Sequence, residues 1–187
     1  MTALAERGTQ RVTIPEPKPV PYTESTREKA ARYTWAGLRL ALGFTFLWAF
    51  VDKVFGFGFA TPEARAWING GQPTKGFLAN ATGPFEGMYH SMAGIAVFDW
   101  LFMLGLASIG IALMLGIGTR IAAGAGSLLL VLMWTASLPL DNNPFLDDHL
   151  IYAGLLVGLA LVKAGDTLGF GKMWARLTLV RKAPWLK

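Results

Sequence analysis

Residues 100–119 and 121–138 form two long segments without a charged residue, and only Arg120 separates them. A helix needs about 20 apolar residues to cross the roughly 30 Å hydrocarbon core of a bilayer, and both segments come close to that length. Hydrophobic residues make up 53% of the 187-residue chain and charged residues only 16%, with a mean hydropathy of +0.41. This balance is too apolar for a typical soluble domain. We therefore expect an integral membrane protein.

Two further segments, 33–56 and 144–164, are predicted to cross the membrane. The clean apolar run of the second has only 13 residues, 150–162, which is about 20 Å of helix. Asn143 and Pro144 are a typical pair for the N-cap and first position of a helix, so we expect the helix to begin there and to gain length from its polar flank. The sequence thus predicts an all-α, four-helix membrane bundle with spans at 33–56, 100–119, 121–139 and 144–164.

The distribution of basic residues predicts the orientation of this bundle. The connection 57–99 contains only Arg65 and Lys75, and the connection 139–146 contains no basic residue. Both chain ends and the turn between the two uncharged segments are basic, with Arg7, Arg11, Lys18, Arg27, Lys29, Arg32, Arg120, Lys163, Lys172, Arg176, Arg181, Lys182 and Lys187. The positive-inside rule then places both termini in the cytoplasm and both larger connections on the outer side of the membrane.

Three segments outside the spans complete the expected organisation. Residues 1–32 are predicted to be a cytoplasmic tail that is rich in proline and has no apolar run typical of a cleavable signal peptide. Residues 165–187 are predicted to be a basic, amphipathic cytoplasmic tail. The outer loop 57–99 is expected to carry short interfacial helices, one in "TPEARAWINGG" and one in "PFEGMYHSMAGIAVF".

The chain contains no cysteine, which excludes disulfide exchange, thiolate-bound iron–sulfur clusters and covalent haem attachment. His90 and His149 are the only histidines and lie in no metal-binding motif, so we expect neither metal nor haem. Phosphate-binding loops and hydrolase motifs are also absent from the sequence. Although the net charge is +5, the basic residues lie at the chain ends, which favours a membrane surface over nucleic acid as the partner.

Ionisable residues inside predicted spans are candidates for function, because they are costly to insert. Arg39 lies about one and a half turns inside the first span. Either its side chain extends to the inner headgroups, or it faces the bundle and pairs with a ligand or a carboxylate. Asp52 and Lys53 mark the outer end of the same span. They are either solvated there, or Lys53 is the cationic partner of an acid near His149.

The stretch "LPLDNNPFLDDHLIY", residues 138–152, concentrates three aspartates, two asparagines and a histidine between two apolar segments. His149, with Asp148 beside it and Tyr152 three residues on, is a candidate for proton transfer, because histidine titrates near neutral pH. We expect Asp148 and His149 to be buried at the outer end of the bundle and paired with Lys53. The alternative is an ordinary polar turn with solvated acids around the start of a helix.

Several short stretches in order resemble the DoxX/DoxD family of bacterial four-span membrane proteins: "FLWAFVDKVFGFGF", "AWINGGQPTKGFL", "DWLFMLGLASIGIALMLGIGTRIAA", "LLLVLMWTASLP" and "NNPFLDDHLIYA". The resemblance covers about residues 35–165, and the long outer loop is more similar to the DoxD branch. It implies the membrane subunit of a thiosulfate:quinone oxidoreductase, which oxidises thiosulfate to tetrathionate and passes electrons to quinone. It also implies a partner subunit.

The resemblance supplies no catalytic residue, so the candidate site rests on the residues themselves. We assign catalysis to His149, Asp148, Asp147 and Lys53, and binding of quinone to Arg39, Asp52, Trp48, Trp134, Asn143 and Tyr152. The main alternative is a non-catalytic accessory subunit of a larger redox membrane complex, and a small transporter is a third. The expected partners are other membrane subunits, the lipid bilayer and a second copy of the chain.

Overall fold

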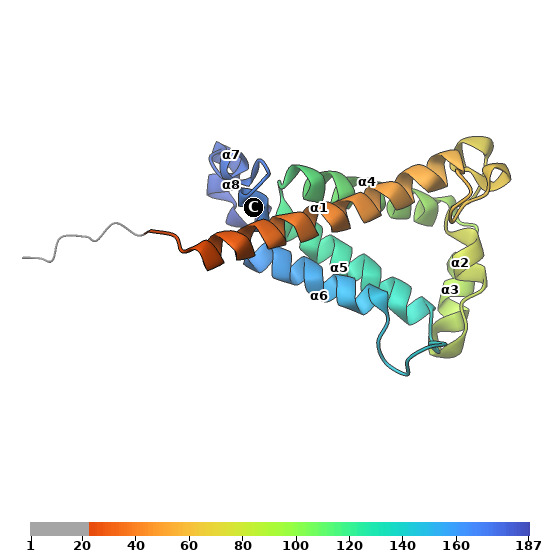
Figure 1. The fold of residues 1–187 in the computed structure, drawn as a ribbon. Helices are drawn as coiled ribbons and strands as arrows, with labels where there is room; N and C mark the ends of the chain where they lie inside the picture. The colour runs from red at the N-terminus through yellow and green to blue at the C-terminus, as the bar shows by residue number, and fades with distance from the viewer. Residues whose placement is uncertain (1–22) are drawn as a thin grey trace, which may run out of the picture.

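The computed structural model describes residues 23–187, so the proline-rich part of the predicted tail lies outside the described residues. All regular secondary structure in this part of the chain is helical, and it contains no strand (Figure 1). Its helices are α1 (Thr26–Phe55), α2 (Lys75–Ala79), α3 (Glu86–Met92), α4 (Ala96–Leu115), α5 (Thr119–Ala136), α6 (Asp148–Leu161), α7 (Gly171–Trp174) and α8 (Thr178–Lys182). Five short 3-10 helices accompany them: η1 (Glu63–Arg65), η2 (Trp67–Asn69), η3 (Gly83–Phe85), η4 (Ala164–Asp166) and η5 (Pro184–Leu186).

Three of these helices are long and apolar enough to cross a membrane: α1 with 30 residues, α4 with 20 and α5 with 18. The next longest apolar helix, α6, has only 14 residues. At 1.5 Å per residue α6 is about 21 Å long, which is shorter than the hydrocarbon core of a typical bilayer. Helix α6 gains only Asp148 and His149 from its polar flank, which is less than predicted.

The four longest helices form two antiparallel pairs, α1 with α4 and α5 with α6, and α4 also packs on α5. We call the end where α1 and α5 begin the basic end, and the end where α1 and α5 finish the loop end. The two pairs lie closest at the basic end and separate toward the loop end, where α2 and α3 lie across the opening (Figure 1). The helices within each pair approach closely at small residues. A Cβ at Gly110 would meet Leu47 at 2.7 Å, and one at Gly126 would meet Leu156 at 2.6 Å.

One apolar core runs between the four helices. Its fully buried side chains include Met103 and Leu113 of α4 and Leu156 and Leu159 of α6. A smaller cluster around Tyr89 packs α3 against the end of α5. The core therefore joins the two helix pairs, and the second cluster attaches the loop to the α5–α6 pair.

Helix α1 begins at Thr26, seven residues earlier than predicted, so part of the expected tail 1–32 is helical. Ser25 and Glu28 form a capping box, in which the Ser25 side chain accepts from Glu28 N and the Glu28 carboxylate accepts from Ser25 N. Such a box supplies partners for backbone groups that the first turn leaves free. The prediction placed the boundary by hydropathy alone and overlooked this polar start signal.

Helix α6 begins at Asp148, so the predicted start at Asn143 and Pro144 is wrong. The Asn143 side chain instead accepts from Phe145 N at 2.9 Å and from Leu146 N at 3.0 Å, forming a turn within the connection. Asp147 is the N-cap, because its side chain accepts from Leu150 N at 3.2 Å. Two polar signals of similar strength lie four residues apart, and the second one starts the helix.

The other boundaries shift for equally local reasons. Helix α4 spans 96–115 instead of 100–119, because Gly116 adopts a left-handed conformation that closes the helix. Helix α5 ends at Ala136, before Pro139, whose ring disfavours helix at the residue preceding it. The outer loop contains short helices as expected, although "TPEARAWINGG" forms two 3-10 turns, which Gly70 terminates.

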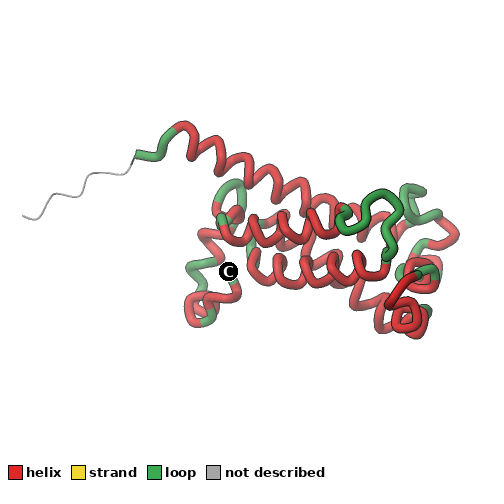
Figure 2. Tube along the Cα trace, turned by 90° about the horizontal axis from the view of Figure 1, so that it is seen from below, coloured by secondary structure: helices red, strands yellow, loops and turns green. Residues whose placement is uncertain are grey.

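The C-terminal segment folds back onto the basic end, where the chain also enters α1 (Figure 2). Phe170 N donates to Leu115 O at 2.8 Å, and Arg120 N donates to Lys187 O at 2.7 Å. The indole of Trp174 donates to Leu186 O at 2.6 Å. Residues 165–187 therefore form a small domain-like cap on α4 and α5, built from short helices, where the sequence predicted a tail.

Candidate functional site

Arg39 is fully buried, and its guanidinium donates to backbone carbonyls. Nη1 donates to Leu113 O and, at 3.1 Å, to Met114 O. Nη2 donates to Thr167 O at 3.3 Å and to Leu168 O at 2.7 Å. The last carbonyls of a helix have no partner within it, so Arg39 closes the end of α4 and fastens the C-terminal segment to it. Arg39 faces the bundle, as one alternative held, but carbonyl oxygens occupy both of its Nη atoms, whereas its buried Nε has no partner among the described residues.

Two buried acids connect the loop 57–99 to the helix ends. Asp52, at the end of α1, accepts from Phe59 N at 3.3 Å and Ala60 N at 3.0 Å. Asp99, in the first turn of α4, accepts from the backbone N and the hydroxyl of Thr74 at 2.8 and 2.7 Å. Carboxylates that accept several such bonds replace the water they lose on burial. Asp52 is thus buried and hydrogen-bonded to the backbone. Its carboxylate is therefore not free to contact a quinone.

Thr74, Asp99 and Tyr89 are structural residues that the sequence analysis did not single out. The Tyr89 hydroxyl bonds Leu132 O at 2.9 Å and Thr135 Oγ1 at 2.5 Å, so it fastens α3 to α5. Asp99 carried a usable signal, since it is an acid directly before an uncharged apolar segment. Its partner in the loop lies 25 residues away, and no local pattern indicates that pairing.

His149 and Asp147 form the most direct pair of titratable side chains at the loop end. His149 Nδ1 lies 2.6 Å from Asp147 Oδ2, and the two side chains are 21% and 18% exposed. An ionised carboxylate can only accept, so Nδ1 carries the hydrogen and Nε2 is left as the proton-accepting atom. Asp148 is 69% exposed and lies 3.6 Å from the same imidazole, so the prediction that Asp148 is buried is wrong. As the first helical residue it points away from the bundle.

Lys53 does not join this pair. Within residues 23–187 it forms no ion pair with a carboxylate, and its ammonium lies 5.9 Å from the centre of the Phe102 ring. The ends of α1 and α6 diverge where the two helix pairs separate, which keeps Lys53 from His149 (Figure 1). The predicted pairing of Lys53 with Asp148 and His149 is therefore wrong.

The remaining candidates divide between the two helix pairs. The indole of Trp134 donates to Phe145 O at 3.2 Å, and the half-buried Tyr152 packs against the core. Both residues therefore lie near the start of α6, as His149 does. Trp48 instead lies on α1 in a cluster of aromatic rings, 6.1 Å from Phe57 and 5.2 Å from Phe59. The structure thus brings Trp134, Asn143, Asp147, Asp148, His149 and Tyr152 together around the start of α6. Trp48, Asp52 and Lys53 form a separate group on α1.

The ten candidate residues lie outside the two pockets at the basic end, and none of them lines either pocket. The donor set at the start of α6 suits proton transfer, because His149 is half-buried and oriented by a carboxylate. The residues assigned to quinone binding do not fit that role as one site, because they lie in separate parts of the molecule.

Asp147, Asp148 and His149 offer ligand atoms that lie within 4.8 Å of one another. Asp147 already caps α6 and holds the imidazole, and Asp148 is largely exposed. The expectation of no metal stays a prediction.

The three long apolar helices and the shared core define an all-α membrane protein. The family model described as "TQO small subunit DoxD" matches residues 34–143, which is more than half of the chain. The chain belongs to the DoxD family, and the resemblance seen in the sequence is confirmed. The matched region ends before Asp147, so the family match does not cover the His149 pair. Neither the curated proteins nor the solved structures contain a match.

Proposed function

We propose that this protein is the membrane subunit of a thiosulfate:quinone oxidoreductase of DoxD type. In this proposal α1, α4, α5 and α6 cross a bacterial cytoplasmic membrane as a four-helix bundle, with both termini in the cytoplasm. The observation that carries the proposal is the match to the DoxD family over residues 34–143. The geometry of the loop end supports a mechanism in which this chain and a partner subunit carry out different steps of the reaction.

The two ends of the helices differ in charge, which supports the proposed orientation. Around the basic end lie Arg27, Lys29, Arg32, Arg120, Lys163, Lys172, Arg176, Arg181, Lys182 and Lys187. Around the loop end acids predominate, with Asp52, Glu63, Glu86, Asp99, Asp141, Asp147 and Asp148 against Lys53, Arg65 and Lys75. Since Lys and Arg in short connections are retained in the cytoplasm, the basic end is the cytoplasmic one.

The overall reaction joins two thiosulfate ions through a new S–S bond and releases two electrons, which quinone takes up together with two protons. This chain has no thiol that could hold a sulfur intermediate. The connection before α6 carries Asp141 and Asp147, which repel a dianion. We therefore assign thiosulfate binding to a partner subunit, and proton handling to this chain.

His149 is the residue to which we assign proton handling. The Asp147 carboxylate orients the imidazole through Nδ1, so that Nε2 can accept and release a proton. Because the two side chains are half-buried, the pair lies between the outside solution and the interior of the helix bundle. A positioned acid or base of this kind contributes about 100-fold to 10,000-fold to a rate.

The test is thiosulfate-dependent reduction of a short-chain quinone by the complex purified in mild detergent with its partner. We expect His149→Gln to lower turnover by at least about 100-fold, with normal assembly of the complex. His90→Gln is the matched control, because His90 is the other histidine and its Nε2 only contacts Ala81 O, at 2.9 Å. Full turnover in His149→Gln would remove His149 from the mechanism.

The separation of the ten candidate residues favours a second function, that of a non-catalytic accessory subunit. In that case the partner carries the whole reaction and this chain anchors it. His149→Gln and Asp147→Asn would then leave turnover unchanged in the assembled complex. Loss of quinone reduction only when the partner dissociates would support this alternative over proton handling.

The proposed topology can be tested on the natural background, because the chain has no cysteine of its own. Ala79→Cys in α2 and Asn142→Cys before α6 are exposed loop-end positions, and Lys172→Cys is exposed at the basic end. An impermeant thiol reagent added to whole cells should label the first two and leave Lys172→Cys unlabelled. Labelling of Lys172→Cys together with Asn142→Cys would show that α6 does not cross the membrane.

A further inference from the structure

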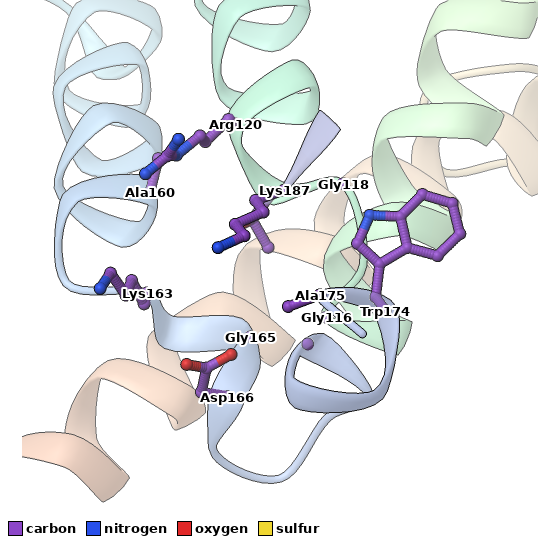
Figure 3. Close-up of a pocket in the computed structure, with 12 residues that line it drawn as sticks. Gly116, Gly118, Arg120, Ala160, Lys163, Gly165, Asp166, Trp174, Ala175 and Lys187 are labelled. Atoms are coloured by element: carbon purple, nitrogen blue, oxygen red, sulfur yellow. The ribbon is translucent and has the colours of Figure 1, made fainter. Parts of the chain in front are cut away.

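A pocket of about 100 Å³ lies at the basic end, between the start of α5, the end of α6 and α7 (Figure 3). Its charged lining residues are Arg120, Lys163, Asp166 and Lys187, and Trp174 forms one wall. In Figure 3 the charged groups of these four residues surround the same opening, on the side away from the indole. Three cations and one acid thus meet in a pocket formed by segments that are distant in sequence.

The cations of this pocket are not neutralised from within the described part of the chain. Lys163 and Lys187 form no ion pair with a carboxylate of residues 23–187. Arg120 Nη1 donates to a neutral oxygen, Pro184 O, at 2.9 Å. Asp166 lines the pocket but forms no ion pair there either. Among the side chains that line the pocket, positive charge is therefore in excess and can attract an anion that enters.

A second pocket, of about 230 Å³, adjoins the first. It lies between α4 and α5 and is lined mainly by small and apolar side chains, among them Ala112, Ile121 and Ala125. Gly118 and Trp174 line both pockets, so the apolar groove meets the basic pocket at the indole. A ligand that fits both parts has an anionic head and a hydrocarbon chain.

We propose that this composite site binds an anionic phospholipid. The phosphate lies among Arg120, Lys163 and Lys187, one acyl chain follows the groove between α4 and α5, and Trp174 packs at the junction of the two. Basic pockets between membrane helices at the cytoplasmic surface are suited to phosphate headgroups, and indoles favour the interface. A zwitterionic lipid brings a second cation to the lysines, and a quinone head carries no charge for them to attract.

The bound lipid would join three parts of the molecule, namely the α4–α5 seam, the end of α6 and the C-terminal segment. A ligand that binds only the folded protein stabilises it in proportion to the logarithm of its concentration above Kd. A lipid bound at this site would thus stabilise the basic end, which the hydrogen bonds of Arg39 also stabilise. This role is independent of the oxidoreductase proposal, because it needs neither electron transfer nor a partner subunit.

The test measures lipid binding to the purified full chain by native mass spectrometry and by thermal unfolding. The probes are phosphatidylglycerol and phosphatidylcholine with the same acyl chains, inorganic phosphate and a short-chain quinone. We expect phosphatidylglycerol to bind and to raise the unfolding temperature, with little effect from the others. Lys163→Gln with Lys187→Gln should weaken binding about 25-fold, since each Lys or Arg near an anionic membrane surface contributes about fivefold.

Matched variants separate the head and chain parts of the site. Lys172→Gln removes an exposed charge that does not line the pocket and should leave binding unchanged. Ala125→Phe fills the groove from an exposed position and should abolish chain binding, whereas Leu128→Phe on the same helix should not. Asp166→Asn should tighten binding.

Three results would overturn the proposal. Equal binding of phosphatidylcholine would show that the cations do not select the lipid. An equal thermal shift with inorganic phosphate would reduce the site to a simple anion pocket. Competitive displacement of phosphatidylglycerol by the quinone at equal concentration would identify a quinone site. Each variant is accepted only if its unfolding temperature without lipid matches that of the parent chain.

Discussion

The charged residues at the basic end and at the loop end of this protein differ in burial and in hydrogen-bond partners. At the basic end Arg39 is fully buried, and its two Nη atoms donate to four carbonyls. At the loop end Asp52 and Asp99 are buried and accept hydrogen bonds from backbone N–H groups. His149 and Asp147, in contrast, are partly exposed to solvent. The fully buried charges thus hold the backbone together, and the half-buried pair keeps an atom available for chemistry. Burial of an ionisable residue in a span does not by itself indicate a site here.

The largest effect should come from removing Arg39. Arg39→Leu leaves the carbonyls of Met114, Thr167 and Leu168 without their side-chain donor, at a cost of roughly 1–3 kcal/mol for each buried carbonyl left unsatisfied. Leu113 O keeps its bond from Gly116 N. We expect most of the protein to be lost to aggregation during purification in detergent, and the remainder to unfold at a much lower temperature. Size-exclusion chromatography and thermal unfolding provide the measurement. Arg27→Leu, at an exposed position of the same helix, is the control.

Arg39→Lys makes this prediction sharper. Lysine keeps the charge but cannot reach four carbonyls on two segments with a planar fork, so its stability should fall between those of the parent and the leucine variant. A lysine variant as stable as the parent would mean that charge alone, rather than the geometry of the donors, holds the basic end together.

The next effect concerns the buried acid at the opposite end. Asp99→Ala removes both bonds to Thr74, which we expect to cost about 1–3 kcal/mol. The loop should then open locally before the helices unfold, because its link to α4 is lost. Limited proteolysis of 57–95 measures this opening. Glu86→Ala, at an exposed position in the same loop, should leave the cleavage rate unchanged.

A smaller effect distinguishes the two roles of Asp147. Asp147→Ala removes the N-cap of α6 and should cost about 0.5–2 kcal/mol, whereas Asp147→Ser retains a good cap and should be nearly neutral. Both variants lose the carboxylate that orients His149. Turnover should therefore fall in both, although only the alanine variant loses stability. Normal turnover in the serine variant would restrict Asp147 to capping.

The smallest effect is expected at Lys53. Since it forms no ion pair in the described residues, Lys53→Gln should change stability by less than about 1 kcal/mol, the range of a cation near an aromatic ring. The ion pair inferred from the sequence requires a loss of roughly 3–5 kcal/mol, as for other buried pairs. Thermal unfolding of Lys53→Gln beside Lys53→Met, which keeps the apolar stem, decides between these values.

The sequence predicted the helical class, the apolar segments and the family, because each depends on hydropathy or on short contiguous stretches. It did not predict where α6 begins, since Asn143 and Asp147 are both good capping residues and only the tertiary structure selects one. The predicted pairing of Lys53 with His149 is wrong because the two helix pairs diverge at the end where both residues lie. The bonds of Asp99 and Arg39 span 25 and more than 70 residues, beyond any local pattern.

The shortness of α6 has a consequence for the lipid around it. In the proposed topology its 14 residues span about 21 Å of a core that is roughly 30 Å thick. Such hydrophobic mismatch is relieved when the bilayer thins locally, at a fraction of a kcal/mol per Å. Headgroups and water then follow the start of α6 inward, to the depth of His149. Proton access would thus depend on acyl-chain length, and reconstitution in lipids of graded length should change turnover without any change in the protein.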